Sequence, residues 1–125
     1  MRITRDEAEA FFAHSSQRRA AMLTGPLPDI GSYFASGGVC GLFHGAPWPG
    51  MIVGHIGVKP GAWGGLDYDA HEVLHEAWAA MKPQLITGWI KADNRAMRAL
   101  CLRIGMMECG RFGMPAPVLI FQWRA

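Results

Sequence analysis

Histidine and cysteine side chains are the candidate reactive groups in this chain of 125 residues, which contains 5 histidines and 3 cysteines. His71, Glu72 and His75 match the pattern H-E-x-x-H, in which two histidines one helical turn apart bind zinc beside a glutamate base. Glu72 also completes a helix capping box with Asp69, which requires no metal. A zinc protease needs a third ligand on a nearby helix and usually a longer chain, so we expect no metal site.

His55 is the candidate for proton transfer, because histidine changes charge near neutral pH. It lies in the apolar run 51–58, M-I-V-G-H-I-G-V, which predicts a β-strand. The two glycines of this run indicate close approach by a ligand or by another backbone. A thin strand against bulky tryptophans explains them equally well. His44 lies near the end of another expected strand that could neighbour His55.

A glycine-rich loop, 59–68, leads from this strand into an expected helix. Backbone amides in such a loop and at a helix start can hold a pyrophosphate. Asp67, Asp69 and Glu72 place negative charge at the same helix start, which suits the helix dipole but opposes an anion. Lys59, Arg95 and Arg98 are candidate phosphate contacts, although the interpretation of each as an ordinary surface charge is favoured.

The elements that must position these groups follow from caps, glycines and apolar spacing. We expect helices at 4–14, 17–23, 69–81 and 95–104, and strands at 33–37, 39–44, 51–58, 85–92, 107–110 and 118–123. Thr4 and Glu7 predict a capping box for the first helix, and Asp93 and Asn94 offer cap oxygens to the last. The helix at 69–81 has an apolar stripe of Ala70, Val73, Leu74, Ala77, Trp78 and Met81. Strand, helix and strand from 51 to 92 form a crossover, so the two strands should be parallel. The fold class is therefore α/β (or α+β): a central mixed sheet with one parallel pair and helices on both faces.

Composition bounds the class of protein. Half of the residues are hydrophobic and 18% are charged, which predicts one compact domain, 1–125, and possibly a homodimer. The net charge is +2 with scattered basic residues, so no nucleic-acid footprint is expected. No run reaches the roughly 18 apolar residues of a membrane span. An odd number of cysteines without C-x-x-C spacing is typical of reduced thiols in a cytoplasm.

Residues 94–106, N-R-A-M-R-A-L-C-L-R-I-G-M, followed by E-C-G-R at 108–111, resemble the C-terminal signature of the GNAT superfamily of acyl-CoA N-acyltransferases. That signature has an asparagine, a short amphipathic helix, Gly-Phe and a strand reading E-x-G-R. Met106 replaces the aromatic residue, and Cys101 stands where many members carry a tyrosine general acid. The resemblance begins near Gly38, so this would be a small, divergent member with a shortened N-terminal part.

The resemblance implies an N-acyltransferase that moves an acetyl group from acetyl-CoA to a small-molecule or protein amine by direct attack. In this family the strand equivalent to 51–58 splays from its parallel neighbour, and its exposed backbone pairs with the pantetheine arm. The family's arginine or glutamine of the phosphate loop aligns with Trp63. The residues that the resemblance assigns to the cofactor are Ile56, Gly57, Val58, Gly64, Gly65, Leu66, Tyr68, Asn94 and Arg98. Asn94 would either contact the pantetheine or order the turn before the helix.

Acyl transfer to an amine needs a base, a donor for the developing oxyanion and an acid for the leaving thiolate. His55 is the predicted base, acting directly or through water, and Cys101 is the predicted acid. Cys101 also suits a purely structural role as a small buried residue. The alternative for the whole chain is a GNAT-shaped binding or assembly module that has lost its chemistry.

Overall fold

The computed structural model describes residues 1–23, 25–62, 65–113 and 117–125. In chain order its elements are β1 (Arg2–Ile3), α1 (Arg5–Ala8), the 3-10 helix η1 (Glu9–Phe11), α2 (Ser15–Ala20), β2 (Ser32–Ser36), β3 (Val39–Gly45), β4 (Met51–Val58), α3 (Asp67–Met81), β5 (Leu85–Lys91), α4 (Arg95–Arg103), β6 (Met107–Phe112) and β7 (Val118–Trp123). Among these residues, no helix has the length and apolar character needed to span a bilayer.

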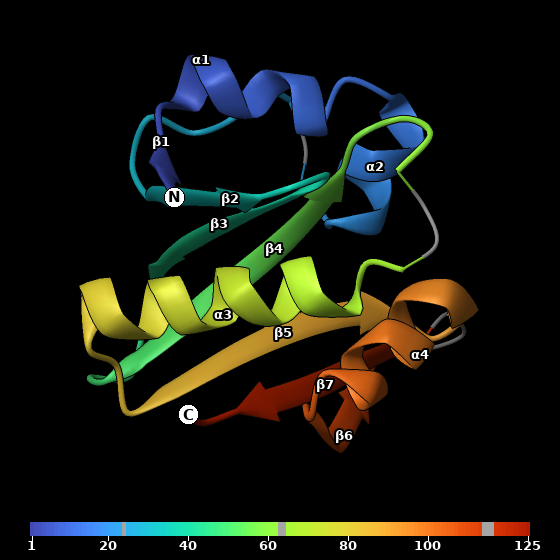
Figure 1. Cartoon of the computed structure of the whole chain (residues 1–125). Helices are drawn as coiled ribbons and strands as arrows, with labels where there is room; N and C mark the ends of the chain where they lie inside the picture. Colours follow the sequence, from blue (N-terminus) through green and yellow to red (C-terminus); the bar gives the residue numbers. More distant parts are fainter. Residues whose placement is uncertain (24, 63–64, 114–116) are drawn as a thin grey trace.

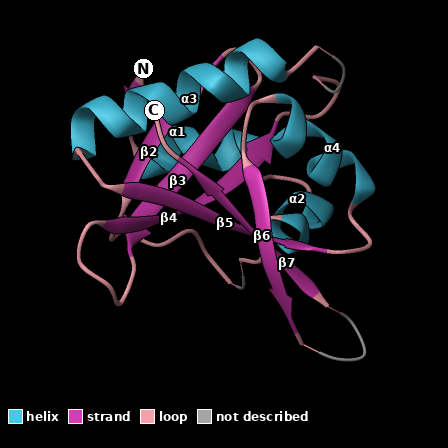
Figure 2. Cartoon of the chain, turned by 90° about the horizontal axis from the view of Figure 1, so that it is seen from below, coloured by secondary structure: helices cyan, strands magenta, loops and turns pink. Residues whose placement is uncertain are grey.

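The strands form a single mixed sheet in the order β1-β2-β3-β4-β5-β7-β6 within the described residues. The pair β4–β5 is parallel, and the other neighbouring pairs are antiparallel. Helices α3 and α4 cover one face, while α1 and α2 lie on the other side of the strands (Figures 1 and 2). The predicted fold class, including the single parallel pair, is confirmed.

Helix α3 buries the predicted apolar stripe, with Ala70, Val73 and Leu74 inside the larger core. The prediction that Asp69 caps this helix is wrong, because the helix begins at Asp67 and Leu66 holds the cap position without a side-chain hydrogen bond. Asp69 lies in the first turn, where its Oδ1 accepts a hydrogen bond from Ser36 Oγ at 2.9 Å. The carboxylate thus joins the helix to β2 and still lies at the positive end of the helix dipole.

The N-terminal part follows the predicted capping box of Thr4 and Glu7, but the helix ends much earlier than expected. Helix α1 stops at Ala8, and the chain tightens into η1 so that Phe11 and Phe12 become buried. In a continuous helix over 4–14, the adjacent side chains of Phe11 and Phe12 would point in different directions, so both could not easily be buried. The free energy gained by burying both rings outweighs the helix propensity of this segment. The second helix begins at residue 15 rather than 17.

The glycines of β4 make room for phenylalanine rings. A Cβ on Gly57 would lie 2.6 Å from Cε1 of Phe12, and one on Gly54 would lie 2.8 Å from Cε1 of Phe43. Both rings are fully buried, so neither can move aside easily. The glycines of β4 therefore allow bulky side chains to pack against a thin strand, as one interpretation predicted. The bulky neighbours are phenylalanines rather than tryptophans.

Candidate active site

The parallel strands β4 and β5 separate halfway along their length. Their pairing runs from Met51–Leu85 to Gly54–Gly88 and ends there, although β4 continues to Val58 and β5 to Lys91. The splay that the family resemblance implies is therefore present in this chain.

Backbone groups of β4 face the split. Lys59 N donates to Gly38 O at 2.9 Å, which continues the β3–β4 ladder by one pair beyond Val58. Alternate residues of an antiparallel strand direct their polar groups to opposite sides, so the N–H groups of Ile56 and Val58 point away from β3. Val58 N donates to Oε1 of Gln17 in α2, at 3.2 Å. A side-chain amide thus lies where a third strand would pair.

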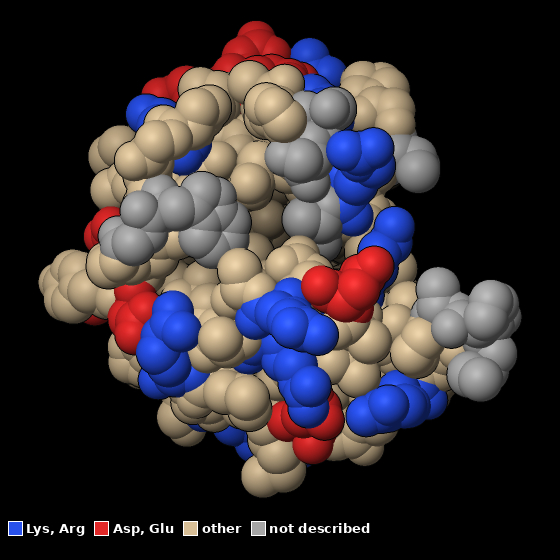
Figure 3. Space-filling view, turned by 90° about the vertical axis from the view of Figure 1, so that its right-hand side faces the viewer, with Lys and Arg blue, Asp and Glu red and all other residues tan. Residues whose placement is uncertain are grey.

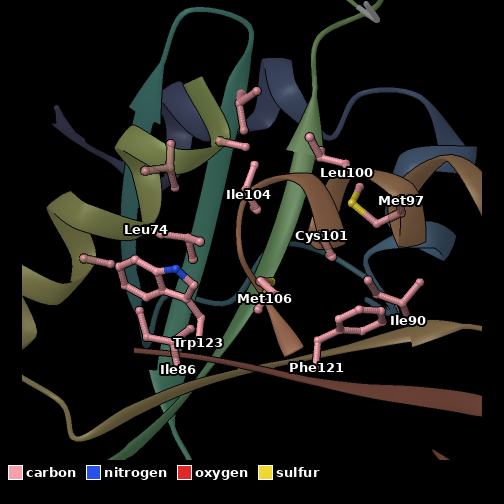
Figure 4. Close-up of a cluster of buried hydrophobic side chains, with 14 of the residues drawn as sticks. Leu74, Ile86, Ile90, Met97, Leu100, Cys101, Ile104, Met106, Phe121 and Trp123 are labelled. Carbon is pink, nitrogen blue, oxygen red and sulfur yellow. The ribbon is translucent and has the colours of Figure 1, made fainter. Parts of the chain in front are cut away.

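A cavity of about 40 Å³ lies in the split. Its walls come from both strands, from Ala21 after α2 and from α4, and they are largely apolar. Figure 4 shows Met97, Cys101 and Met106 with Ile90 and Phe121 in the apolar cluster beside it. On the side of the molecule in Figure 3 the surface is hollowed, and lysine and arginine side chains lie around the hollow. The cavity itself is apolar, and both basic and acidic side chains lie on the surface in this view.

His55 has both ring nitrogens engaged at this cavity. Its Nδ1 lies 2.6 Å from Ala21 O, and its Nε2 lies 2.8 Å from Nε2 of His44. Burial lowers the pKa of His55 below its ordinary value of 6.5; the bond to Ala21 opposes this shift, and the charge of His44 adds to it. His55 is therefore a neutral imidazole at neutral pH. Any proton that it receives must displace or pass through one of these contacts.

Cys101 lies on the buried face of α4 and lines the same cavity. Burial raises the pKa of its thiol to about 12, so the sulfur keeps its proton at neutral pH. A thiol with such a high pKa is a poor proton donor to a thiolate whose own thiol has a lower pKa. The surroundings match the alternative interpretation, a small apolar residue of the core.

The predicted cofactor residues fall into separate groups. Of the predicted site residues, His55, Ile56 and Cys101 line the cavity. Outside its lining lie Gly57, Val58, Gly65, Leu66, Tyr68, Asn94 and Arg98. Gly64 and Trp63 lie outside the described residues. Tyr68 is exposed and Leu66 is buried, so of these two only the tyrosine side chain faces solvent.

The carboxylates at the start of α3 have different partners within the protein. Arg103 Nε lies 2.9 Å from Oδ2 of Asp67, and Asp69 is bound to the Ser36 hydroxyl. Arg103 therefore offsets the opposition of Asp67 to a phosphate, whereas Asp69, bound by a neutral hydroxyl, still opposes one. Arg98 pairs with Glu108 at 2.9 Å, so it already has an anionic partner.

Asn94 caps α4 as predicted: its Oδ1 accepts from Met97 N at 3.2 Å. This contact accounts for the interpretation in which Asn94 orders the turn between β5 and α4. Contact with pantetheine stays a prediction.

Replacing Asn94 with alanine should lower the free energy of unfolding by about 1 kcal/mol, the usual effect of losing such a cap. Urea unfolding monitored by circular dichroism measures this, with Asp93→Ala as the matched control. If Asn94 only orders the turn, acetyl-CoA affinity should stay near that of the control. A large loss of affinity at unchanged stability would instead indicate direct contact.

Two contributors to the site, Gln17 and Ala21, could not be identified from sequence patterns. Gln17 reaches Val58 from a helix whose position is set by tertiary packing. Ala21 contributes its backbone carbonyl oxygen, which every residue type has, so the sequence does not mark this position. His44 had a partial signal, because period-two alternation places it on the same face as Leu42, and the register sets Leu42 opposite His55.

The His71–His75 pair lies apart from this cavity. Their Nε2 atoms are 3.2 Å apart, and the His75 ring meets Trp123 edge-on at 5.0 Å between centroids. Among the described residues, no group of three or more histidine, cysteine, aspartate or glutamate side chains is arranged to hold a metal ion.

No protein-family model matches the sequence, and no curated protein matches it. Solved structures do match. Ribosomal-protein-alanine N-acetyltransferase from Brucella melitensis superposes with a TM-score of 0.74 at 18% identity, covering 98% of this chain and 97% of that one. An N-acetyltransferase from Staphylococcus aureus Mu50 gives 0.73 at 16% identity, covering 98% and 95%.

A GNAT-family acetyltransferase from Bacillus anthracis gives a TM-score of 0.59 at 16% identity over 68% of this chain, which spans 57% of that protein's length. Identities this low bear on architecture rather than on substrate. The seven-stranded mixed sheet of the described residues, with its single parallel pair, matches the architecture of these structures. The chain therefore has the fold of the GNAT acetyltransferases.

Proposed function

We propose that this chain is an acetyl-CoA-dependent N-acetyltransferase in which an amine attacks the thioester directly, in the split between β4 and β5. The observation that carries the proposal is the end of strand pairing at Gly54–Gly88, next to the half-buried imidazole of His55, whose pKa is lowered by desolvation. The open edge of β4 offers backbone N–H and C=O groups, which require hydrogen-bond partners. The cavity beside it can hold apolar groups of a ligand.

The edge of β4 is suited to the amide-bearing pantetheine arm. Ile56 and Val58 present N–H and C=O groups to the split as they would to a neighbouring strand. The arm would replace Gln17 at Val58 N, exchanging one hydrogen bond for another. Gly57 lies between these residues, and its missing side chain leaves space for Phe12 on the opposite side.

The pyrophosphate is assigned to the start of α3. Gly65 has a φ of +68° with open space where a side chain would stand, and Leu66 is the cap residue before the first helical residues, Asp67 and Tyr68. Free amides of a helix start bind anions. We assign Gly64 the same role by position, and Arg98 to the phosphates, provided that it can leave Glu108.

In the reaction the amine nitrogen bonds to the thioester carbon, the carbon–sulfur bond breaks, and the amine loses a proton. We assign the N–H of Ile56, which points away from β3, to the carbonyl oxygen as it becomes negative. His55 accepts the proton, for which its neutral ring is suited. We assign Cys101 to the apolar wall, because a thiol with a pKa of about 12 is a poor donor to the thiolate.

A binding or assembly module without catalysis is the second candidate. Both nitrogens of His55 are engaged within the protein, and Gln17 already occupies the amide of Val58. A site that satisfies its own polar groups in this way needs no ligand to complete it.

Calorimetric titration of the chelator-treated protein with acetyl-CoA, and with CoA for comparison, tests the proposal. We expect a dissociation constant in the micromolar range, about −8 kcal/mol. Acetyl transfer should then be assayed with several amines, including a peptide beginning with alanine, the acceptor class named for the Brucella protein. Neither heat nor a shift in melting temperature at millimolar ligand would contradict the proposal. Binding without transfer to any amine would favour the second candidate.

A further inference from the structure

Two aromatic side chains, Trp89 of β5 and Phe112 of β6, lie partly exposed beside the cavity. Trp89 lines the cavity and is 40% exposed, and Phe112 is 47% exposed. Their rings meet edge-on, with 5.9 Å between centroids and an interplanar angle of 82°. An aromatic pair that is open to solvent and continuous with an apolar cavity offers a binding surface for a flat apolar group.

The register of the split places Trp89 on the same face of the sheet as His55. One residue after the last pair, Gly54–Gly88, His55 and Trp89 occupy matching positions on the two sides of the split. Matching positions of neighbouring strands direct their side chains to the same face. The His55 ring contacts the carbonyl oxygen of Ala21, just after α2. Trp89 therefore lies on the face toward α2, opposite to the face that α3 and α4 cover.

The face that carries His55 is also the face from which an attacking amine would approach. His55, as the proposed base, can take the proton of the amine only if both lie on the same side of the split. The phosphates of the cofactor are assigned to the start of α3, which covers the other face. A group attached to the amine would thus lie against Trp89 and Phe112.

The charges near this face favour an acceptor without a second positive charge. Lys91 lies two residues beyond the tryptophan on β5, and no described carboxylate forms an ion pair with it. Glu108, the one acidic residue in the sequence of strands β4 to β7, pairs with Arg98 of α4 on the opposite face. Helix α2 adds Arg18 and Arg19 and no acidic side chain. A polyamine would meet repulsion from these positive charges.

We propose that the acetyl acceptor is a small aromatic primary amine without a second positive charge, and that Trp89 and Phe112 bind its ring. The identity of the reaction rests on the proposed function, and the products would be the N-acetyl amide and the CoA thiol. The two aromatic residues touch the ring of the acceptor and determine specificity, whereas the proton of the amine goes to His55. Ring-to-ring contact adds to the gain from apolar burial, which separates aromatic from short aliphatic amines.

Acetyl transfer to three amines tests the acceptor class. Phenethylamine should have a kcat/KM at least roughly tenfold above that of butylamine, which lacks the ring, and above that of spermidine, which carries further positive charges. Equal values for the three amines, or a preference for spermidine, would overturn the proposal and leave the proposed function standing.

The role of the tryptophan is tested by the split between the kinetic constants. Trp89→Ala should raise KM for phenethylamine roughly 10- to 100-fold, while KM for butylamine and for acetyl-CoA stays unchanged. Trp89→Phe keeps a ring and should restore most of the loss. Trp48→Ala is the matched control, because Trp48 is an exposed tryptophan between β3 and β4 that does not line the cavity. An equal rise of KM for both amines in Trp89→Ala would overturn the proposal.

Nitrogen-15 NMR of the tryptophan indoles tests binding without turnover, in the presence and absence of CoA. Phenethylamine should shift the indole signal of Trp89, identified by its loss in Trp89→Phe, and leave that of Trp48 in place. No shift at millimolar amine would overturn the proposal. If Trp89→Ala lowers the melting temperature strongly, Phe112→Ala provides the second variant, since the Phe112 ring is half exposed. A wild-type protein that acetylates no amine would contradict the proposed function, while the NMR titration would still decide where the aromatic amine binds.

Discussion

Replacing His55 with glutamine should lower kcat for acetyl transfer by roughly 10²- to 10³-fold, the usual contribution of a positioned base. The glutamine amide can still donate to the Ala21 carbonyl, so the local packing is kept while the proton acceptor is lost. Release of CoA thiol, followed continuously with a disulfide reagent, measures kcat. Binding of acetyl-CoA should change little, because His55 is assigned to the amine's proton rather than to the cofactor.

The pH dependence gives this prediction a sign. Because the pKa of His55 is lowered from 6.5, its neutral form persists below that pH, and kcat/KM should fall only as the pH drops through the lowered value. The same shift stabilises the fold above about pH 6.5, and this stabilisation is lost as the pH falls through the lowered pKa. His55→Gln should lose the acid limb of both curves. His75→Gln is the control; wild-type activity with an intact acid limb in His55→Gln would refute the assignment of the base.

Replacing Gly88 with valine should weaken acetyl-CoA binding by roughly 10- to 100-fold, equivalent to an overpacking cost of about 1–3 kcal/mol. Gly88 is the last residue of β5 that pairs with β4, and it lines the cavity. A Cβ there would stand 3.8 Å from Gly54 O and from the Cε of Met106, at ordinary contact distance. The two further methyl groups of valine would occupy the cavity itself. Calorimetric titration measures the change in affinity.

Gly88→Ala is the matched control, since its single methyl group fits the observed space. The melting temperature of both variants should stay close to that of the wild type, because valine favours strands and replaces glycine in one. Equal affinity in Gly88→Val and wild type would mean that the cofactor does not use this cavity. A collapse in melting temperature would instead show overpacking of the core, and Gly88→Ser would then provide the smaller step.

The order of strands and helices could be predicted from the sequence where local signals, such as caps and apolar runs, agree with the packing of the assembled fold. The apolar run before Asn94, the cap itself and Gly105 after α4 each point to the same strand–helix unit, and the structure confirms it. At α3 a local signal competes with a distant partner: Asp69 resembles a cap but is bound by Ser36 of β2. Side-chain propensity does not reveal such a partner, which lies 33 residues away.

In the candidate site, even more of the decisive contacts come from residues that are distant in the sequence. His55 could be selected because a histidine between glycines in an apolar strand is unusual, and its burial agrees with that choice. The contacts that decide its protonation come from a backbone carbonyl after α2 and from a histidine on a neighbouring strand. Their positions depend on where α2 packs and on strand register, which only the assembled fold determines.

The contact between Phe12 and Gly57 also sets the order in which the chain can fold as it leaves the ribosome. Phe12 emerges first, yet the surface that buries its ring includes a residue 45 positions later in the chain, as their numbers show. Until β4 has been synthesised, the α1–η1 segment has no complete apolar surface to cover, and its two phenylalanines stay exposed to chaperones and proteases. Translation of the first half therefore yields a segment that depends on the second half for its folded state, so the two halves should not be separable into independently folding fragments.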